Sequence, residues 1–136
     1  LAGGWLSGRY RKGVEIEESL RARRIPGRYD LSMPENQRKL DVADRLANVA
    51  DEAGLTLVHL AIAFVLEHPG VTSAIIGPRT MDQLTSQLDA ADVKLSSDVL
   101  DEIDRIVPPG TNLNDADAGY APPSITAAWR RRRGAR

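Results

Sequence analysis

The stretch of this sequence best suited to chemistry is a strand-like run that ends in glycine and leads through an arginine into a helix. The run "VTSAII" occupies residues 71–76, the loop "GPRT" follows, and a helix is expected from about Met81 to Ala91. Gly77 lets a ligand approach the backbone, the helix start offers free N–H groups to an anion, and Arg79 adds a bidentate donor. These groups suit a nucleotide phosphate; the competing interpretation of Arg79 is a solvated surface charge.

The first ten residues, "LAGGWLSGRY", are a second candidate for anion binding. Glycines at positions 3, 4 and 8 surround Trp5 and allow a close approach of the backbone to a ligand. The stretch is not a P-loop, because the terminal Lys-Ser/Thr pair is absent. A strand leading into such a loop would have to precede Leu1, so we expect the chain to be part of a larger fold.

No metal site is predicted. His59 and His68 are nine residues apart and do not share the helix face that an i, i+4 pair would form, so we expect His59 to be packed or hydrogen-bonded. The segment "DADAG" has glycine at its fifth place and no glutamate at its twelfth, which does not match a calcium loop. The absence of cysteine excludes disulfides and thiolate sites.

Three helices are expected to support these loops. The first begins at Asn36 and is stopped by Gly54, the second is capped by Thr56 and is apolar on nearly all sides until Pro69, and the third runs from Ser96 to residue 107. The buried face of the first helix is marked by apolar residues spaced three and four apart: Leu40, Ala43, Leu46, Ala47 and Ala50. Residues 11–35 are predicted to be a connection with a short exposed helix.

The predicted strand at 71–76 raises a structural problem. A buried parallel strand needs neighbours on both sides, and the chain offers one partial candidate, residues 1–7. Two strands make neither a closed barrel nor an adequate sheet. The sequence therefore predicts an incomplete α/β domain.

Composition argues against partners recruited by overall charge. The 136 residues carry 18 basic and 19 acidic side chains, a formal net charge of -1, which draws the chain to neither nucleic acid nor an anionic membrane. No apolar run approaches the roughly 18 to 20 residues that span a bilayer. We expect a cytoplasmic protein with no nucleic-acid or membrane partner. The terminal "WRRRR" is interpreted as a frayed tail, with a basic binding segment, or Trp129 folded over a pocket, as alternatives.

Two separated motifs resemble the aldo-keto reductase family. "PGVTSAIIGPRTMDQL" resembles the family's last strand and helix, and "LAGGWLSGRY" is similar to its seventh-strand segment. The helix "TLVHLAIAFVLEHPGV" also looks like the family's corresponding helix. The resemblance implies the C-terminal part of a (β/α)8 TIM barrel over residues 1–107, namely the end of strand seven, helix seven, strand eight, helix eight and an extra helix, followed by a tail at 108–136.

The resemblance implies that NADP(H) is the cofactor. By matching positions, the residues that contact it are Leu1, Ala2, Gly3, Arg9, Gly77, Arg79, Gln83 and Gln87. The first four would lie along the pyrophosphate, Gly77 and Arg79 would hold the ribose 2′-phosphate, and Gln83 would touch the adenine side. A Glu-Asn pair usual in the family is replaced here by Ser86 and Gln87. A loop arginine often joins the phosphate cluster, and the candidates left open are Arg21, Arg23 and Arg24.

None of the family's catalytic Asp, Tyr, Lys and His can be placed on this chain. The resemblance implies part of an enzyme that reduces small aldehydes or ketones to alcohols by hydride transfer, and we expect the isolated chain to be inactive. The alternative is a non-catalytic module that pairs with a complementary barrel fragment or holds an acidic partner. The identity of the substrate and the oligomeric state stay open.

Overall fold

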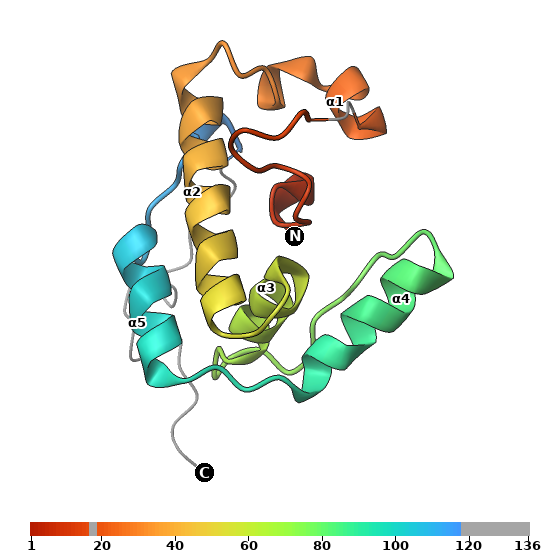
Figure 1. Ribbon diagram of the computed structural model, residues 1–136, viewed down its shortest axis with the longest axis vertical. Helices are drawn as coiled ribbons and strands as arrows, with labels where there is room; N and C mark the ends of the chain where they lie inside the picture. The colour runs from red at the N-terminus through yellow and green to blue at the C-terminus, as the bar shows by residue number, and fades with distance from the viewer. Residues whose placement is uncertain (17–18, 118–136) are drawn as a thin grey trace.

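The computed structural model describes residues 1–16 and 19–117, and within these residues it contains helices and no β-strand. The tail from 118 on, with its arginine run and Trp129, lies outside the described residues. In chain order the elements are η1 (Ala2–Gly4), α1 (Leu20–Arg24), η2 (Pro26–Arg28), α2 (Pro34–Glu52), α3 (Leu57–Leu66), α4 (Met81–Leu88), η3 (Asp89–Asp92), α5 (Ser97–Ile106) and η4 (Asp115–Asp117). Figure 1 shows α2, α3 and α5 together, with α4 as an arm beside them.

Side-chain caps set the starts of the helices, as the sequence predicts. Thr56 Oγ1 accepts the His59 N–H at 3.1 Å, and Ser96 Oγ accepts the Val99 N–H at 3.3 Å. Gly54 has φ of 69° just after α2, which is the left-handed conformation expected of the residue that ends a helix. The first long helix begins two residues earlier than predicted because a proline is well suited to its first turn.

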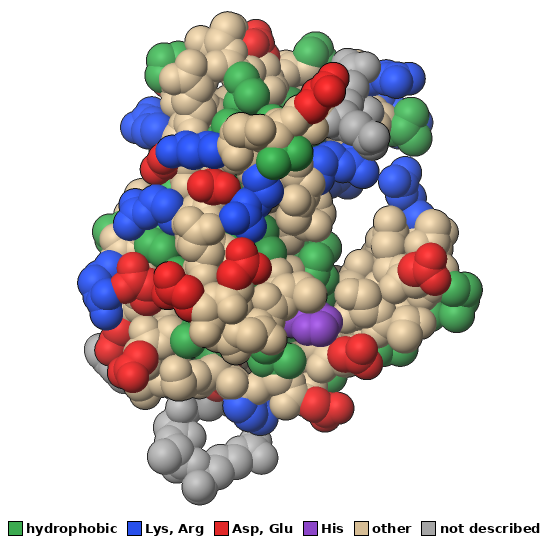
Figure 2. Space-filling view, in the orientation of Figure 1, with side chains coloured by type: hydrophobic (Ala, Val, Ile, Leu, Met, Phe, Trp, Pro, Cys, Tyr) green, Lys and Arg blue, Asp and Glu red, His purple; other side chains and the backbone are tan. Residues whose placement is uncertain are grey.

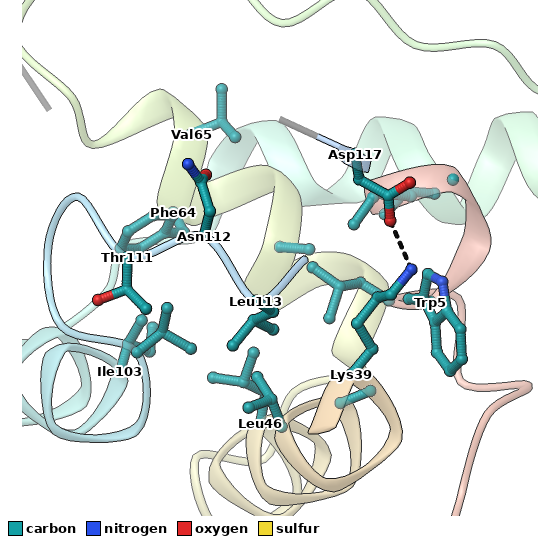
Figure 3. Close-up of a pocket in the computed structure, with 18 of the residues that line it drawn as sticks. Trp5, Lys39, Leu46, Phe64, Val65, Ile103, Thr111, Asn112, Leu113 and Asp117 are labelled. Carbon is teal, nitrogen blue, oxygen red and sulfur yellow. Dashed lines mark hydrogen bonds and ion pairs between the residues drawn. The ribbon is translucent and has the colours of Figure 1, made fainter. Parts of the chain in front are cut away.

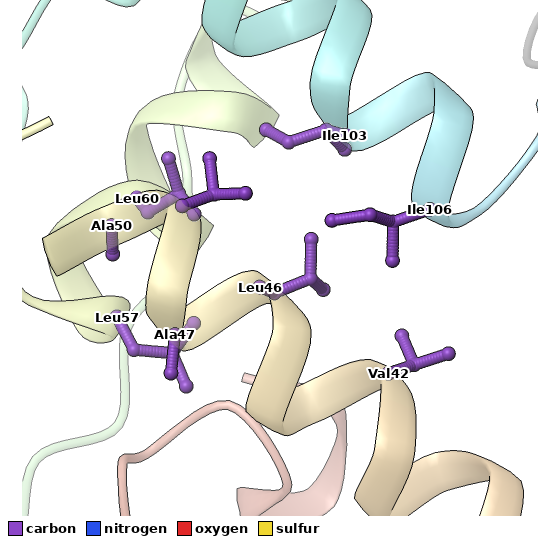
Figure 4. Close-up of a cluster of buried hydrophobic side chains, with 9 residues drawn as sticks. Val42, Leu46, Ala47, Ala50, Leu57, Leu60, Ile103 and Ile106 are labelled. Atoms are coloured by element: carbon purple, nitrogen blue, oxygen red, sulfur yellow. The ribbon is translucent and has the colours of Figure 1, made fainter. Parts of the chain in front are cut away.

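The hydrophobic core lies where α2, α3 and α5 meet. Figure 4 shows Leu46 of α2 between α3 and α5, with Ile103 and Ile106 opposite it. The predicted face of α2 is confirmed at Ala43, Leu46, Ala47 and Ala50, which are buried, whereas Leu40 is only half-buried. The second helix is less enclosed than expected, because Val65 is exposed. Burial of this apolar surface is the main source of stability.

The strand predicted at 71–76 is not formed in the described chain. These residues have no regular structure, and Ile75 is 101% exposed. The N-terminal candidate for its partner does not pair with it, because residues 1–7 curl into a turn closed by hydrogen bonds from Gly4 N–H to Leu1 O and from Ser7 N–H to Gly4 O. A strand needs a neighbouring strand to complete its hydrogen-bond ladder, and without one this run stays irregular, with Ile75 in solvent and Val71 and Ile76 only partly buried.

Among the described residues, no single helix has the length and apolar character to cross a membrane. Helices α2 and α3 meet such a test only when counted together, and they meet at an angle of 90°.

Candidate functional site

The N-terminal turn presents exposed backbone at Leu1, Ala2 and Gly3. Ala2, Gly3 and Gly4 have φ of 45°, 70° and 109°, and the N–H groups of Gly4 and Trp5 donate to Leu1 O and Ala2 O at 2.8 and 3.3 Å. The left-handed conformation at Gly3 favours glycine. The turn therefore places its first three residues at the surface with their backbone accessible to a ligand.

A stack of three aromatic rings holds this turn against the rest of the molecule. The ring centroids of Trp5 and Tyr10 lie 4.4 Å apart, and those of Trp5 and Tyr29 lie 5.7 Å apart with nearly parallel planes at 8°. Lys39 Nζ of α2 lies 5.2 Å from the Trp5 ring, close enough for a cation–π interaction. The stack joins the N-terminal turn, which carries Trp5, to the segment of Tyr10 and to the loop at η2, which ends in Tyr29.

The η2 loop, which carries Tyr29, is fastened to the start of α2 by Asn36. This side chain is fully buried, and its Nδ2 donates to Gly27 O at 2.9 Å and to Asp30 O at 2.8 Å. Its Oδ1 has no hydrogen-bond partner. The two hydrogen bonds from this one buried amide to backbone carbonyls fix the loop, and with it the position of the Tyr29 ring.

Tyr29 connects the loop to the N-terminal turn. Its hydroxyl donates to Gly3 O at 2.9 Å, and the Arg21 side chain lies next to the same hydroxyl. A methyl group at Gly3 would lie 3.1 Å from Tyr29 Oη and 3.8 Å from Arg21 Nη1. Burial, helped by the neighbouring Tyr10, raises the pKa of Tyr29, and Arg21 opposes that rise. Of the three loop arginines that the sequence left open, the structure places Arg21 beside Gly3.

Arg9, the other cation predicted for this end of the site, is exposed and forms no hydrogen bond or ion pair with another described residue. The next arginine is held differently. Arg11 Nε donates to Asp44 Oδ1 at 2.9 Å and its Nη2 donates to Asn48 Oδ1 at 2.9 Å, so it fastens the segment to α2. Arg9 keeps its charge available, whereas Arg11 has a structural role.

The second predicted group lies at the start of α4. Thr80 caps this helix by accepting the Gln83 N–H at 3.2 Å, and Gln83 Oε1 accepts the Arg79 N–H at 2.9 Å. This pattern is close to a capping box, so Gln83 shapes the loop and is not simply free for a base. Gly77 and Arg79 are exposed, and no carboxylate of the described residues pairs with Arg79. Gln87 is buried, which leaves little of its amide for a ligand.

His59 fastens α4 to α3. Its Nε2 lies 2.8 Å from Ser86 O, which confirms the expectation that His59 is hydrogen-bonded. Because this bond joins α4 directly to α3, we predict that His59→Phe loosens α4 and raises amide hydrogen exchange across Met81–Leu88 several-fold, as expected for loss of about 0.5–1.5 kcal/mol. Exchange measured by NMR tests this, with amides of α2 as the internal reference. Unchanged exchange in α4 would show that the bond does not hold the arm.

The cofactor-binding residues predicted in the N-terminal turn and those predicted at the start of α4 lie on opposite sides of a hollow. Figure 2 shows this hollow between the main body and the α4 arm, with Lys and Arg side chains at its open end on both sides. The residues of the N-terminal turn line a groove on the main body, whereas Gly77, Arg79, Gln83 and Gln87 do not line it. The described chain therefore contains two separate clusters of phosphate-type donors and does not bring them into one pocket.

The groove on the main body has a volume of about 1040 Å³ and is mostly apolar. Figure 3 shows Leu46, Phe64 and Leu113 along it and Lys39 reaching Asp117 at the Trp5 end. Asp117 also accepts from Arg28 Nε at 2.9 Å, and Lys39 is only 7% exposed. Neither Asn36 nor Lys39 is among the functional residues predicted from the sequence. The available signal was their position, because both continue the three-and-four spacing of the apolar face of α2 as polar residues.

The described residues contain no group of three or more His, Cys, Asp or Glu side chains that could hold a metal ion.

Comparison with known proteins places these features in a context. A model of the aldo/keto reductase family matches residues 1–108. The chain is 28% identical over 109 residues to the "Putative voltage-gated potassium channel subunit beta" of Schizosaccharomyces pombe, a match covering 79% of this chain and 32% of that protein. It is 33% identical over 116 residues to the "Probable voltage-gated potassium channel subunit beta" of Arabidopsis thaliana, covering 79% of this chain and 33% of that protein. The chain thus spans about a third of the length of these relatives.

Proposed function

Because the chain belongs to the aldo/keto reductase family, we propose that it forms the NADP(H)-binding part of a reductase that converts small aldehydes or ketones to alcohols. The observation that supports this proposal most directly is the environment of Arg79, its backbone hydrogen bond and its charge. Its backbone N–H is fixed by Gln83 at the start of α4, while its exposed guanidinium has no carboxylate partner among the described residues. An arginine that directly precedes the cap of a helix in this way is suited to a phosphate group.

The described residues fit the phosphates of a dinucleotide better than they fit its adenine. Near the N-terminal turn, exposed backbone at Gly3 lies beside the Arg21 guanidinium, which suits a pyrophosphate. At the other cluster, no heavy atom lies within 4 Å of the place a Cβ would take at Gly77, so the backbone there is open to a ligand. The buried Gln87 does not fit an adenine contact in this arrangement.

When bound, the cofactor would supply the hydride for carbonyl reduction. The residues of this chain would hold its phosphates and orient it, with Leu1, Ala2, Gly3, Arg9 and Arg21 on one side and Gly77 and Arg79 on the other. The family's catalytic Asp, Tyr, Lys and His have no counterpart that we can assign, so the proposed role of the chain is binding. We expect the isolated chain to hold cofactor without reducing a carbonyl compound.

The proposal extends to the setting of the protein. We propose a cytoplasmic location and a small carbonyl substrate, with neither nucleic acid nor membrane as a partner. The near balance of 18 basic and 19 acidic side chains supports the part of this proposal that concerns nucleic acid and membranes.

A second candidate is a non-catalytic interaction module. It is favoured by the exposed apolar run at 71–76, where Ile75 has no packing partner, and by the names of both relatives, which describe channel subunits. A segment that forms no strand ladder within the described residues is suited to pairing with a strand of another chain. A folded chain that fails to bind NADPH would favour this candidate.

Titration with NADPH at low ionic strength tests the proposed function. We expect Arg79→Gln to weaken binding about tenfold to a hundredfold, because a charge-assisted hydrogen bond contributes about 1.5–3 kcal/mol. Arg105→Gln is the matched control, since Arg105 is also exposed but lies on α5 paired with Glu102. Equal affinity of the Arg79→Gln variant and the unmodified chain would contradict the proposal.

A further inference from the structure

Among the described residues, some arginines pair with a carboxylate and others do not. Arg11, Arg28 and Arg105 pair with the carboxylates of Asp44, Asp117 and Glu102, which neutralise them locally. Arg21 is exposed, and no carboxylate of the described residues pairs with it. Its guanidinium lies beside the neutral hydroxyl of Tyr29. A phenol can orient a guanidinium without cancelling its charge, so within the described part of the chain the positive charge of Arg21 is not neutralised.

The Tyr29 hydroxyl has two roles at one point. It donates to Gly3 O at 2.9 Å, and it faces the Arg21 guanidinium, whose Nη1 lies 3.8 Å from the place a Cβ would take at Gly3. A tyrosine hydroxyl that donates to a carbonyl keeps lone pairs that can accept from a guanidinium N–H. The contact joins a backbone carbonyl of the N-terminal turn to a side chain from α1, which are 18 positions apart in the sequence.

The Tyr29 ring is itself fixed from the buried side. Its centroid lies 5.7 Å from that of Trp5 and 5.9 Å from that of Tyr10, and the backbone on either side of it is held by Asn36 through Gly27 O and Asp30 O. A free arginine side chain carries about 2 kcal/mol of rotamer entropy, which a ligand would otherwise have to offset on binding. A rigid hydroxyl at this point reduces that cost before any ligand arrives.

We propose that Tyr29 is a positioning residue, which sets the Gly3 backbone and the Arg21 guanidinium in one arrangement that receives a phosphate of the dinucleotide. The proposal rests on the proposed function for the identity of the ligand. The positioning itself depends only on the contacts among Tyr29, Gly3 and Arg21.

A double-mutant cycle tests the proposal with NADPH as the probe. We expect Tyr29→Phe to weaken NADPH binding about threefold to tenfold, and to have no further effect in the Arg21→Gln background, because the hydroxyl acts through Arg21. Tyr10→Phe is the matched control, since it removes a hydroxyl from the same ring stack without touching Gly3 or Arg21. Equal weakening by Tyr29→Phe with and without Arg21 would overturn the proposal, as would no weakening.

A second measurement separates this proposal from the proposed function. In NMR spectra of the ligand-free chain, we expect a slowly exchanging Arg21 Nε–H signal that broadens or disappears in Tyr29→Phe and persists in Tyr10→Phe. Identical Arg21 signals in the unmodified chain and Tyr29→Phe would overturn the positioning role whatever the chain binds. Loss of order at Arg21 in Tyr29→Phe, together with no NADPH binding by the unmodified chain, would overturn the proposed function and keep the positioning role.

Discussion

Replacing Leu60 with alanine is expected to lower the free energy of unfolding by about 2–5 kcal/mol. Leu60 is 2% exposed and belongs to the cluster that joins α3 to α2 and α5. Removing most of its side chain loses apolar burial and leaves a cavity that the flanking helices can only partly fill. The free energy of unfolding of a small domain is about 5–15 kcal/mol in total, so this change would remove a large share of it.

Urea denaturation followed by circular dichroism measures this effect, with Ile75→Ala as the control. Ile75 is 101% exposed, so we expect its truncation to change stability by no more than about 0.5 kcal/mol. The pair therefore also tests the conformation of residues 71–76. Comparable losses at the two positions would mean that this segment is packed as a strand, contrary to the arrangement described above.

Asn36→Ala is expected to have the second largest effect, a loss of about 1–3 kcal/mol. The substitution removes both hydrogen bonds from Asn36 Nδ2, at 2.9 Å to Gly27 O and 2.8 Å to Asp30 O, and leaves two carbonyls to find other partners. Because these bonds hold the loop that carries Tyr29, we also expect the raised pKa of Tyr29 to fall toward its ordinary value as the ring becomes better solvated.

Thermal unfolding and an alkaline titration of tyrosine absorbance measure the two parts of this prediction. Gln37→Ala is the neighbouring control, because Gln37 Nε2 also donates to a backbone carbonyl, that of Leu31 at 2.9 Å, but at an exposed position. We expect Gln37→Ala to cost less and to leave the pKa of Tyr29 unchanged. A stable Asn36→Ala variant with an unchanged tyrosine titration would show that Asn36 does not hold the loop.

The helical part of the fold was predictable because its signals are local. Spacing marked the buried face of α2, and Thr56 and Ser96 could be assigned as caps from their place before an apolar run. His59 could be expected to form a hydrogen bond because a lone polar group in an apolar helix requires a partner. Each of these inferences uses interactions within about four residues or a general requirement of burial.

The conformation of residues 71–76 was not predictable in the same way. The β-branched run favours a strand, but a strand is completed by partners that are distant in sequence. In the described chain residues 1–7 form a closed turn, so no ladder is available and Ile75 stays in solvent. Local preference and tertiary context disagree here, and tertiary context decides the outcome.

The residues proposed for the candidate site stand out in the sequence, whereas the contacts that support them do not. Glycines and arginines next to a helix start are visible in sequence, whereas the contact between Tyr29 and Gly3 joins residues 26 positions apart through a side-chain hydroxyl. Lys39 could have been noticed as a charge on an apolar face, yet its partner Asp117 is 78 positions away. Such pairings depend on the packed arrangement of the helices.

Titration of the unmodified full chain with NADPH and with NADH is the most direct test of the central claim. If Arg79 and its neighbours receive a phosphate, NADPH should bind saturably and more tightly than NADH, and the difference should shrink as salt is raised. Equal affinity for the two nucleotides would contradict an Arg79 contact with the 2′-phosphate. No binding of either nucleotide by a folded chain would contradict the cofactor-binding role as a whole.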